Sequence, residues 1–260
     1  MGWKLLLFTT ILLTVLGGMP AADEIPMQDK RSGFDFMAPE NRAMQEDDMS
    51  NPGMLFITEG ERLWQKPDGN AAIACAGCHG AAAQSMRGTA ARYPAIDKAT
   101  GRPIDLQQRI NLCRQVKQSA SPFPFESLEL VTLTAYVAHQ SRGMPIAPPV
   151  DDKLSVHREN GKRLFERRLG QLGLSCAACH DERWGQRLGG SVIPQAHPTA
   201  YPLYRLEWQT LGSLQRRLRN CMIGMRAEPY PYGAPEFIEL ELYLMSRASG
   251  LRIETPGVRP

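Results

Sequence analysis

The sequence contains "CAGCH" at residues 75–79 and "CAACH" at residues 176–180, two copies of Cys-x-x-Cys-His that lie 101 residues apart. In this motif two thiols attach covalently to a porphyrin and the adjacent histidine binds its iron, because one helical turn presents all three groups together. A thioredoxin-like redox motif explains the cysteines but not the repeated histidine, and zinc is usually held by four ligands at other spacings. The motifs predict two covalently attached c-type haems, held by Cys75, Cys78 and His79 and by Cys176, Cys179 and His180.

Both motifs belong to a longer internal repeat. "GERLW" begins at Gly60 and "GKRLF" at Gly161, each fifteen residues before the first cysteine of its motif. Further matches are "RYP" (92–94) with "AYP" (200–202), "LQQRI" (106–110) with "LQRRL" (214–218), and Tyr136 with Tyr243. The offset is 101 up to the motif histidines, 108 at the next two matches and 107 at the tyrosines. The second copy therefore carries seven extra residues between His180 and Tyr201. Such a repeat predicts two copies of one supersecondary unit.

The pattern of apolar residues predicts an all-α fold. Apolar side chains recur at spacings of three and four over residues 126–140 and 234–246, which predicts amphipathic helices that Gly143 and Gly250 end. We find no convincing strand. The proline-containing "MPIAPPVDD" (144–152) predicts a linker. The predicted organisation is a signal peptide (1–22), an extended N-terminal arm (23–55), a first cytochrome c domain (56–148) and a second (149–260), the last two related by internal duplication.

The N-terminus predicts export. In "MGWKLLLFTTILLTVLGGMPAADE" one lysine precedes an apolar run that is too short for a comfortable membrane span, so we expect a cleaved signal peptide and a periplasmic protein. An uncleaved anchor is the alternative. Export also makes three disulfides an alternative use of the six cysteines, but their spacing favours haem. A net charge of +3 gives no electrostatic footprint for nucleic acid.

The ligand on the distal side of each iron is less obvious. Met144 lies 65 residues after His79, which suits an ordinary small cytochrome c. The repeat, however, places Leu251 opposite Met144, so the second unit has no methionine there.

Two cysteines align instead. Cys113 and Cys221 are related by the offset of 108, and each follows an arginine, Arg109 or Arg217, by four residues on one face of a predicted helix. We therefore predict thiolate as the distal ligand of both irons, with His79 and Cys113 on one and His180 and Cys221 on the other. A Cys113–Cys221 disulfide is the alternative. Thiolate ligation favours ferric iron, which indicates more than a relay role for at least one haem.

These features resemble the SoxA family of cytochromes. The resemblance rests on the twin motifs, each followed by a helical cysteine, and on "SGFDFMAPENRAMQEDDMSNPG" (32–53) and "RRLRNCMIGMRAEPYPYGAPEF" (216–237). It implies an L-cysteine S-thiosulfotransferase of sulfur oxidation that joins thiosulfate to a cysteine of the SoxYZ carrier and releases two electrons. It also implies a SoxX-type monohaem cytochrome c as partner and a c-type cytochrome as electron acceptor.

The same resemblance assigns roles in the second unit. It implies that Cys221 is both haem ligand and catalytic cysteine, often modified to a persulfide, and that Arg217 binds substrate. A planar guanidinium fork suits the sulfonate of thiosulfate. Arg216, Arg219 and Arg226 would draw an anion inward, and "EPYPYG" (228–233) would form a loop near Cys221 that admits a partner's arm.

Two other functions compete. A dihaem electron-transfer protein without its own catalysis would use Cys221 only as a ligand. A dihaem peroxidase needs an open iron position, and two cysteine ligands count against it. His139, His157 and His197 have no counterparts in the repeat, and we interpret them as surface or core residues.

Overall fold

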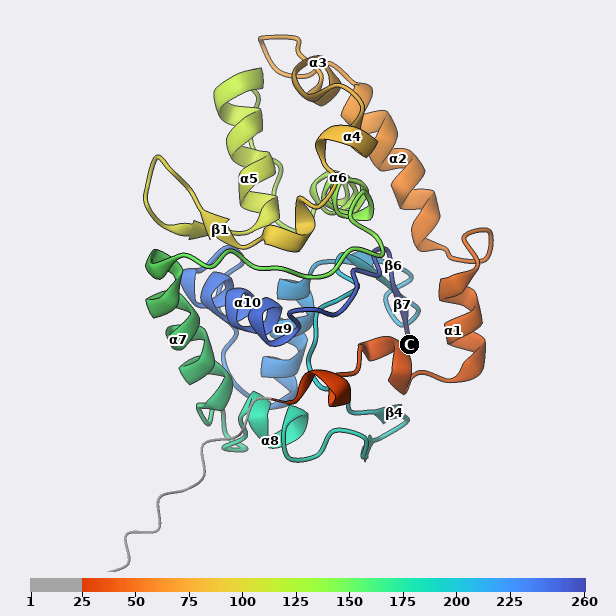
Figure 1. Ribbon diagram of the computed structural model, residues 1–260, viewed down its shortest axis with the longest axis vertical. Helices are drawn as coiled ribbons and strands as arrows, with labels where there is room; N and C mark the ends of the chain where they lie inside the picture. Colours follow the sequence, from red (N-terminus) through yellow and green to blue (C-terminus); the bar gives the residue numbers. More distant parts are fainter. Residues whose placement is uncertain (1–24) are drawn as a thin grey trace, which may run out of the picture.

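The computed structural model describes residues 25–260, so the predicted signal peptide lies outside the described residues. The described chain consists mainly of helices, arranged as two units of the same design (Figure 1). The helices of the first unit are α2 (Gly53–Gln65), α3 (Cys75–His79), α4 (Ala82–Ser85), α5 (Leu106–Cys113) and α6 (Leu128–His139). Those of the second are α7 (Asp152–Glu166), α8 (Cys176–His180), α9 (Leu214–Gly224) and α10 (Pro235–Arg247). None of the described helices is long and apolar enough to cross a membrane.

Each unit is built on a close crossing of its first and last long helices, α2 with α6 and α7 with α10. A Cβ on Gly60 would lie 2.5 Å from Cβ of Tyr136, and a Cβ on Gly161 would lie 2.0 Å from the carbonyl oxygen of Glu239 and 2.9 Å from Cβ of Tyr243. The repeated glycine and tyrosine are therefore partners at equivalent crossings, and only glycine lets the backbones approach this closely.

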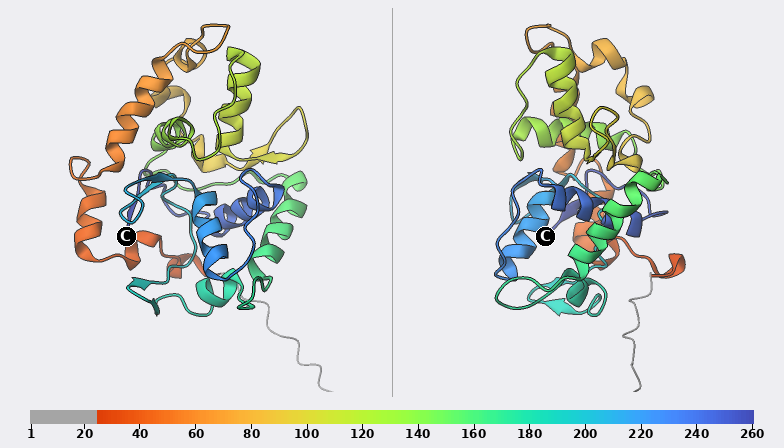
Figure 2. Two further views of the ribbon diagram at one scale, coloured as in Figure 1. Left: turned by 180° about the vertical axis from the view of Figure 1, so that it is seen from behind. Right: turned by 90° about the vertical axis from the view of Figure 1, so that its left-hand side faces the viewer.

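The two units are related by an approximate twofold axis. The segments that follow α6 and α10 pair antiparallel and exchange hydrogen bonds in equivalent pairs. Gly143 N donates to Ile253 O (2.8 Å), and the equivalent Gly250 N donates to Ile146 O (2.9 Å). Ile253 N donates to Met144 O (2.9 Å) as Ile146 N donates to Leu251 O (2.8 Å). The linker is thus a structural seam between the units. Both views of Figure 2 show the first unit stacked on the second.

Short strands occur where the sequence predicted none. They are β1 (Ala95–Ile96), β2 (Pro103–Ile104), β3 (Arg187–Leu188), β4 (Ser191–Val192), β5 (Leu203–Arg205), β6 (Thr210–Gly212) and β7 (Val258–Arg259). β1 pairs with β2, β3 with β4, and β5 pairs antiparallel with β6 and parallel with β7. Runs of two or three residues are too short to produce a period of two in the sequence. The β3–β4 hairpin lies within the predicted seven-residue insertion.

The helix α6 differs from the expected amphipathic pattern. All nine residues from Leu130 to Ala138 are buried, because α2, β6 and the second unit surround it. A helix buried on every side carries apolar residues all round. In α10, by contrast, half-buried residues are interspersed with the buried ones.

The N-terminal arm wraps both units. It contains the 3₁₀ turns Met27–Asp29 and Gly33–Phe36 and the helix α1 (Pro39–Glu46), and α1 lies against β7 (Figure 1). Gln45 Oε1 accepts a hydrogen bond from Val258 N (2.9 Å), and Arg31 N donates to Gln195 Oε1 (2.7 Å). Helix α2 begins at Gly53, so the predicted boundary at residue 56 falls within its first turn.

The crossing of α7 and α10 predicts a stability effect. Gly161→Ala should lower the free energy of unfolding by roughly 2–4 kcal/mol, since the new methyl would collide with backbone rather than with a flexible side chain. Chemical denaturation measures this. Gly224→Ala is the matched helical control, because nothing lies within 4 Å of its Cβ position; this variant should be unchanged or slightly more stable. Equal free energies of unfolding for Gly161→Ala and Gly224→Ala would contradict the close crossing of α7 and α10.

Candidate haem sites

The second Cys-x-x-Cys-His motif forms the short helix α8. Ser175 begins this helix, and its hydroxyl accepts a hydrogen bond from Ala178 N (3.1 Å). Cys176, Cys179 and His180 therefore lie on little more than one helical turn, as covalent attachment to one macrocycle requires.

The ring of His180 is held in the orientation of an iron ligand. Its Nδ1 lies 2.6 Å from Pro194 O, and because a carbonyl can only accept, Nδ1 carries the hydrogen and Nε2 keeps its lone pair. Burial lowers the pKa of His180, so the neutral ring is favoured. A hydrogen bond from the other ring nitrogen is the usual support of a histidine ligand.

Opposite His180 stands helix α9. Ser213 begins it by accepting a hydrogen bond from Arg216 N (3.1 Å). Arg217 and Cys221 line the same cavity as His180, which has a volume of about 530 Å³. Burial, together with a smaller contribution from the charge of the neighbouring Cys221, raises the pKa of Cys176 to about 12. A helical attachment motif, an oriented histidine and a thiol across a cavity fit a six-coordinate c-type haem.

The first motif forms helix α3 and lines a smaller cavity of about 250 Å³ together with Cys113. Cys75, Cys78, His79 and Arg109 all border it, whereas Met144 does not and instead contacts the Gly88 position. No hydrogen bond from another described residue reaches the His79 ring, whose nearest aromatic neighbour is Trp64, with ring centroids 5.6 Å apart. Met86 also borders the cavity, which the sequence reasoning missed.

No disulfide joins any two of the six cysteines, all of which lie among the described residues. Cys113 and Cys221 border different cavities, so the alternative of a disulfide between them is not found. Nor do residues 25–260 contain a group of three or more His, Cys, Asp or Glu side chains placed to hold a bare metal ion.

The two equivalent arginines have different surroundings. Arg109 Nη2 forms an ion pair with Asp97 Oδ1 at 3.0 Å, and its Nε donates to the Tyr93 hydroxyl at 3.2 Å. Arg217 borders the larger cavity and forms no side-chain hydrogen bond or ion pair with any residue in the described range; its electrostatic neighbours are Cys221, Tyr201 and Glu207.

Two other arginines of this region lie over aromatic rings. Arg216 lies over the ring of Trp208 at 4.3 Å and Arg219 over that of Tyr232 at 4.7 Å, while Arg226 is exposed after the end of α9. The cation–π contacts give Arg216 and Arg219 a structural role, and the attraction of an anion by these arginines stays a prediction.

None of the residues of the loop "EPYPYG" borders the cavity of Cys221, although Tyr230 packs in the cluster of Met222, the residue after Cys221. That the loop admits a partner's arm stays a prediction. Tyr232 stacks on Phe125 of the first unit, with ring centroids 6.5 Å apart, and Gly233 N donates to Gln215 Oε1 at 2.8 Å. The loop therefore joins the two units.

Several residues that shape the larger cavity lie outside the repeat. They are Phe36, Met37 and Asn41 of the arm, Arg187 and Val192 of the β3–β4 hairpin, and Arg259 and Pro260 at the C-terminus. His197, which we interpreted as a surface or core residue, is buried and borders this cavity too, with no partner for its Nε2. No pattern in the sequence indicated these residues, because segments distant along the chain bring them together.

Comparisons with known proteins agree with this architecture. A family model of the SoxA/TsdA cytochrome c domain matches residues 59–146 and 160–253. The L-cysteine S-thiosulfotransferase subunit SoxA of Rhodovulum sulfidophilum is 35% identical over 229 residues, which cover 88% of this chain and 80% of the relative. The subunit of the same name from Pseudaminobacter salicylatoxidans is 36% identical, covering 90% and 82%. The crystal structure of SoxXA from P. pantotrophus aligns with a TM-score of 0.86 and 31% identity, over 89% of this chain and 87% of that chain.

A buried ion pair beside His180 yields a second prediction. Arg247 pairs with Asp181 and donates through Nε to Gln195 O at 3.0 Å. Arg247→Met should destabilise the protein by about 3–5 kcal/mol, because it leaves the Asp181 charge without its partner. Asp181→Asn combined with Arg247→Met should recover part of the loss in denaturant unfolding. If the double variant loses as much free energy of unfolding as Arg247→Met and Asp181→Asn lose together, Arg247 and Asp181 do not act as a pair.

Proposed function

The chain belongs to the SoxA/TsdA cytochrome c family, and we propose that it is a SoxA-type L-cysteine S-thiosulfotransferase that joins thiosulfate to a carrier cysteine. The observation that carries the proposal is the unpaired Arg217 one helical turn before Cys221, in a cavity that also contains the oriented His180. The names of the relatives support the same activity.

Two c-type haems are part of the proposal. Cys75 and Cys78 would hold the first and Cys176 and Cys179 the second, with His79 and His180 on the iron. Cys113 and Cys221 would stand on the distal sides. When bound, each haem supplies a one-electron acceptor close to the thiols.

Arg217 is the group suited to the sulfonate. A guanidinium presents two parallel N–H donors to two oxygens of an oxyanion, and no described carboxylate occupies them. Arg109 could bind a sulfonate in the first unit only if its ion pair with Asp97 were broken. The proposal therefore assigns catalysis to the second unit.

Cys221 would carry the substrate. Its thiolate and the outer sulfur of thiosulfate form an S–S bond, giving Cys–S–S–SO₃⁻ and two electrons. A carrier thiolate then attacks the outer sulfur, and the Cys221 thiolate leaves. In sum, RSH and S₂O₃²⁻ give RS–S–SO₃⁻, one proton and two electrons. A persulfide at Cys221 would add one sulfur to the same chemistry.

The partners follow from this reaction. A flexible carrier arm of the SoxYZ type must bring its cysteine to the cavity, and a c-type cytochrome must accept the electrons. The likeness to the crystal structure of SoxXA supports a SoxX-type partner, and the predicted signal peptide supports a periplasmic location. A pure electron carrier remains the second candidate function, but it gives no role to an unpaired arginine beside the distal thiol.

Haem attachment can be tested directly. Cys176→Ala should impair attachment at the second motif and leave the first intact, so pyridine haemochrome content should fall from two haems per chain to one. Cys75→Ala should give the reciprocal result. The intact mass of each variant identifies what remains bound. Two fully attached haems in either variant would contradict the assignment of its motif.

Arg217 separates the enzyme from the carrier. Arg217→Ala should reduce thiosulfate-dependent turnover with the carrier roughly 30- to 1000-fold, since one charge-assisted partner contributes about 2–4 kcal/mol. Arg217→Lys should recover only part, because an ammonium lacks the fork.

The matched control is Arg109→Ala, at the equivalent position of the first unit. It should lower stability through the loss of the Asp97 ion pair while turnover stays nearly unchanged. Haem spectra should be preserved in all three variants. Equal losses of turnover in folded, haem-loaded Arg217→Ala and Arg109→Ala would refute catalysis at Cys221.

A further inference from the structure

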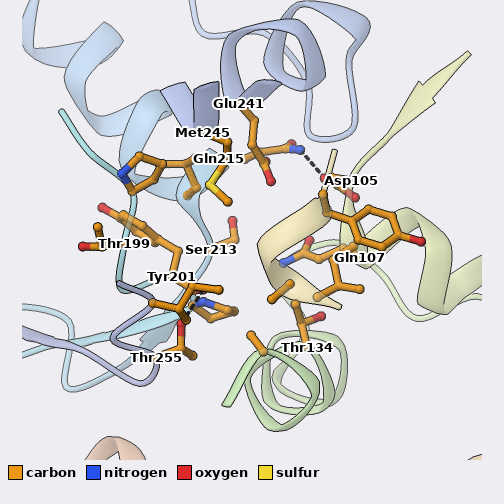
Figure 3. Close-up of a pocket in the computed structure, with 18 of the residues that line it drawn as sticks. Asp105, Gln107, Thr134, Thr199, Tyr201, Ser213, Gln215, Glu241, Met245 and Thr255 are labelled. Carbon is orange, nitrogen blue, oxygen red and sulfur yellow. Dashed lines mark hydrogen bonds between the residues drawn. The ribbon is translucent and has the colours of Figure 1, made fainter. Parts of the chain in front are cut away.

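A small cavity lies between the two units, away from the attachment motifs. Its volume is about 70 Å³, and its wall consists largely of residues that the repeat makes equivalent (Figure 3). The pairs are Tyr93 with Tyr201, Leu106 with Leu214, Gln107 with Gln215, Thr134 with Glu241, and Ile146 with Ile253. The last pair belongs to the seam that relates the units, so the cavity lies close to the approximate twofold axis.

Two carboxyl groups break the symmetry of this cavity. Asp105 occupies the position of Ser213, and Glu241 occupies that of Thr134, whose hydroxyl donates to Leu130 O of its own helix at 2.6 Å. Both acids line the cavity, and Figure 3 shows the Glu241 and Asp105 side chains on the same side of it.

Some hydrogen-bond acceptors at this cavity lack a donor. Asp105 is 3% exposed and accepts from Gln108 N (2.7 Å) and Gln215 Nε2 (2.8 Å). The Glu241 carboxyl receives no hydrogen bond from any residue of the described chain, 25–260. Gln107, which is 5% exposed and borders the cavity, has an amide oxygen without a partner. The unpaired amide oxygen of Gln107 is buried and therefore costly, and the Glu241 carboxyl, which is half-buried, also lacks a donor. A proton on Glu241 together with a water molecule would satisfy both groups.

No positive charge compensates the acids. The titratable groups that line the cavity are Asp105, Glu241, Tyr93 and Tyr201, and no Lys, Arg or His is among the described lining residues. The neighbouring faces of α6 and α9 contribute only neutral groups. Burial raises the pKa of Asp105 to about 6, and burial together with the Asp105 charge raises the pKa of Glu241 well above its ordinary value. Since Asp105 has donors and Glu241 has none, the proton belongs on Glu241.

We infer that this cavity is a proton-binding site, in which Glu241 is a neutral acid that shares its proton with Asp105 and Gln107 through ordered water, and that its proton affinity responds to the charge on both haems. The second part rests on the proposed haems; the first does not.

The walls of the cavity explain the coupling. Tyr93 and Leu106 also border the cavity of the first motif, and Tyr201 and Leu214 border that of the second. One layer of side chains therefore separates the proton site from each haem site. An electron added on either side makes proton loss from Glu241 harder, and by linkage a bound proton makes reduction easier. Thiosulfate conjugation supplies both the electrons and a proton.

Infrared spectroscopy tests the proton site in the oxidised holoprotein. At pH 7 the protein should show the C=O stretch of a protonated, buried carboxylic acid, and Glu241→Gln should abolish it. Glu236→Gln, on the first turn of the same helix and outside the cavity, should leave it unchanged. The proton site is refuted if the wild type lacks the band or if Glu241→Gln retains it.

Stability provides an independent readout for the same site. A carboxyl with a raised pKa in the folded state favours folding below its unfolded pKa, and this contribution is lost as pH rises through the folded pKa. Wild-type stability should therefore fall as pH rises from about 4 through about 6 and beyond. The fall should be smaller in Glu241→Gln, which should be the more stable protein at pH 8. A variant with an unchanged pH profile would overturn the assignment.

Redox titration tests the coupling. The midpoint potential of the holoprotein should fall as pH rises from 5 to 8, and Glu241→Gln should flatten this dependence while Glu236→Gln preserves it. If the infrared band is confirmed but the midpoint potential of Glu241→Gln still falls with pH as in the wild type, the coupling is refuted and the proton site is not. In a chain that lacks haem, only the redox titration would fail, whereas the infrared band and the pH dependence of stability would still report on the proton site. Failure of the proposed function is therefore distinguishable from failure of the proton site.

Discussion

The helix crossings at Gly60 and Gly161 are the constraint on which the rest of the structure depends. Each glycine lets two backbones meet where a methyl group would collide, and this contact fixes the first and last helices of a unit. The aromatic residue four positions later, Trp64 or Phe165, then lies beside the motif histidine, with ring centroids 5.6 and 6.5 Å apart. The position of the histidine therefore follows from a contact between backbones rather than from the motif alone. A repeat that preserves the glycine, the aromatic residue and the tyrosine also preserves a cavity beside each motif.

Symmetry explains the framework, and departures from symmetry explain the chemistry. An arginine is present one turn before both Cys113 and Cys221, yet Arg109 forms an ion pair with Asp97 while Arg217 forms no ion pair with any described residue. The second unit also gains the β3–β4 hairpin, the arm and the C-terminus as walls of its cavity. Pro194, which follows that hairpin, accepts the hydrogen bond that orients His180. One insertion thus both adds to the wall of the cavity and orients His180, which makes the second unit the better candidate for substrate chemistry.

Covalent and periodic features were predictable from the sequence, whereas features made by distant segments were not. The two motifs, the duplication, the long helices and the alignment of Cys113 with Cys221 all follow from spacing along one chain. The ion pair of Arg109 depends on Asp97, which the β1–β2 turn places beside it, and no periodicity reports such a turn. His197 has no counterpart in the repeat, so its burial in the second cavity follows only from its contact with Arg31 of the arm. Arg216 and Arg219 have the same sequence character as Arg217, and only the positions of Trp208 and Tyr232 distinguish them.

Duplication has a further consequence at the interface of the units. Residues near an approximate twofold axis meet their own equivalents, so a buried acid in both copies would place like charges together. Here Thr134 and Ser213 keep one member of each equivalent pair neutral, and Asp105 and Glu241 bring two carboxyls rather than four to the cavity. Two such groups without a cation among the lining residues are costly to ionise together, because each charge disfavours the other. Gln215 then connects this pair to α9, two residues before Arg217. The interface that holds the two units together is therefore also the place where a proton can respond to electrons on either side.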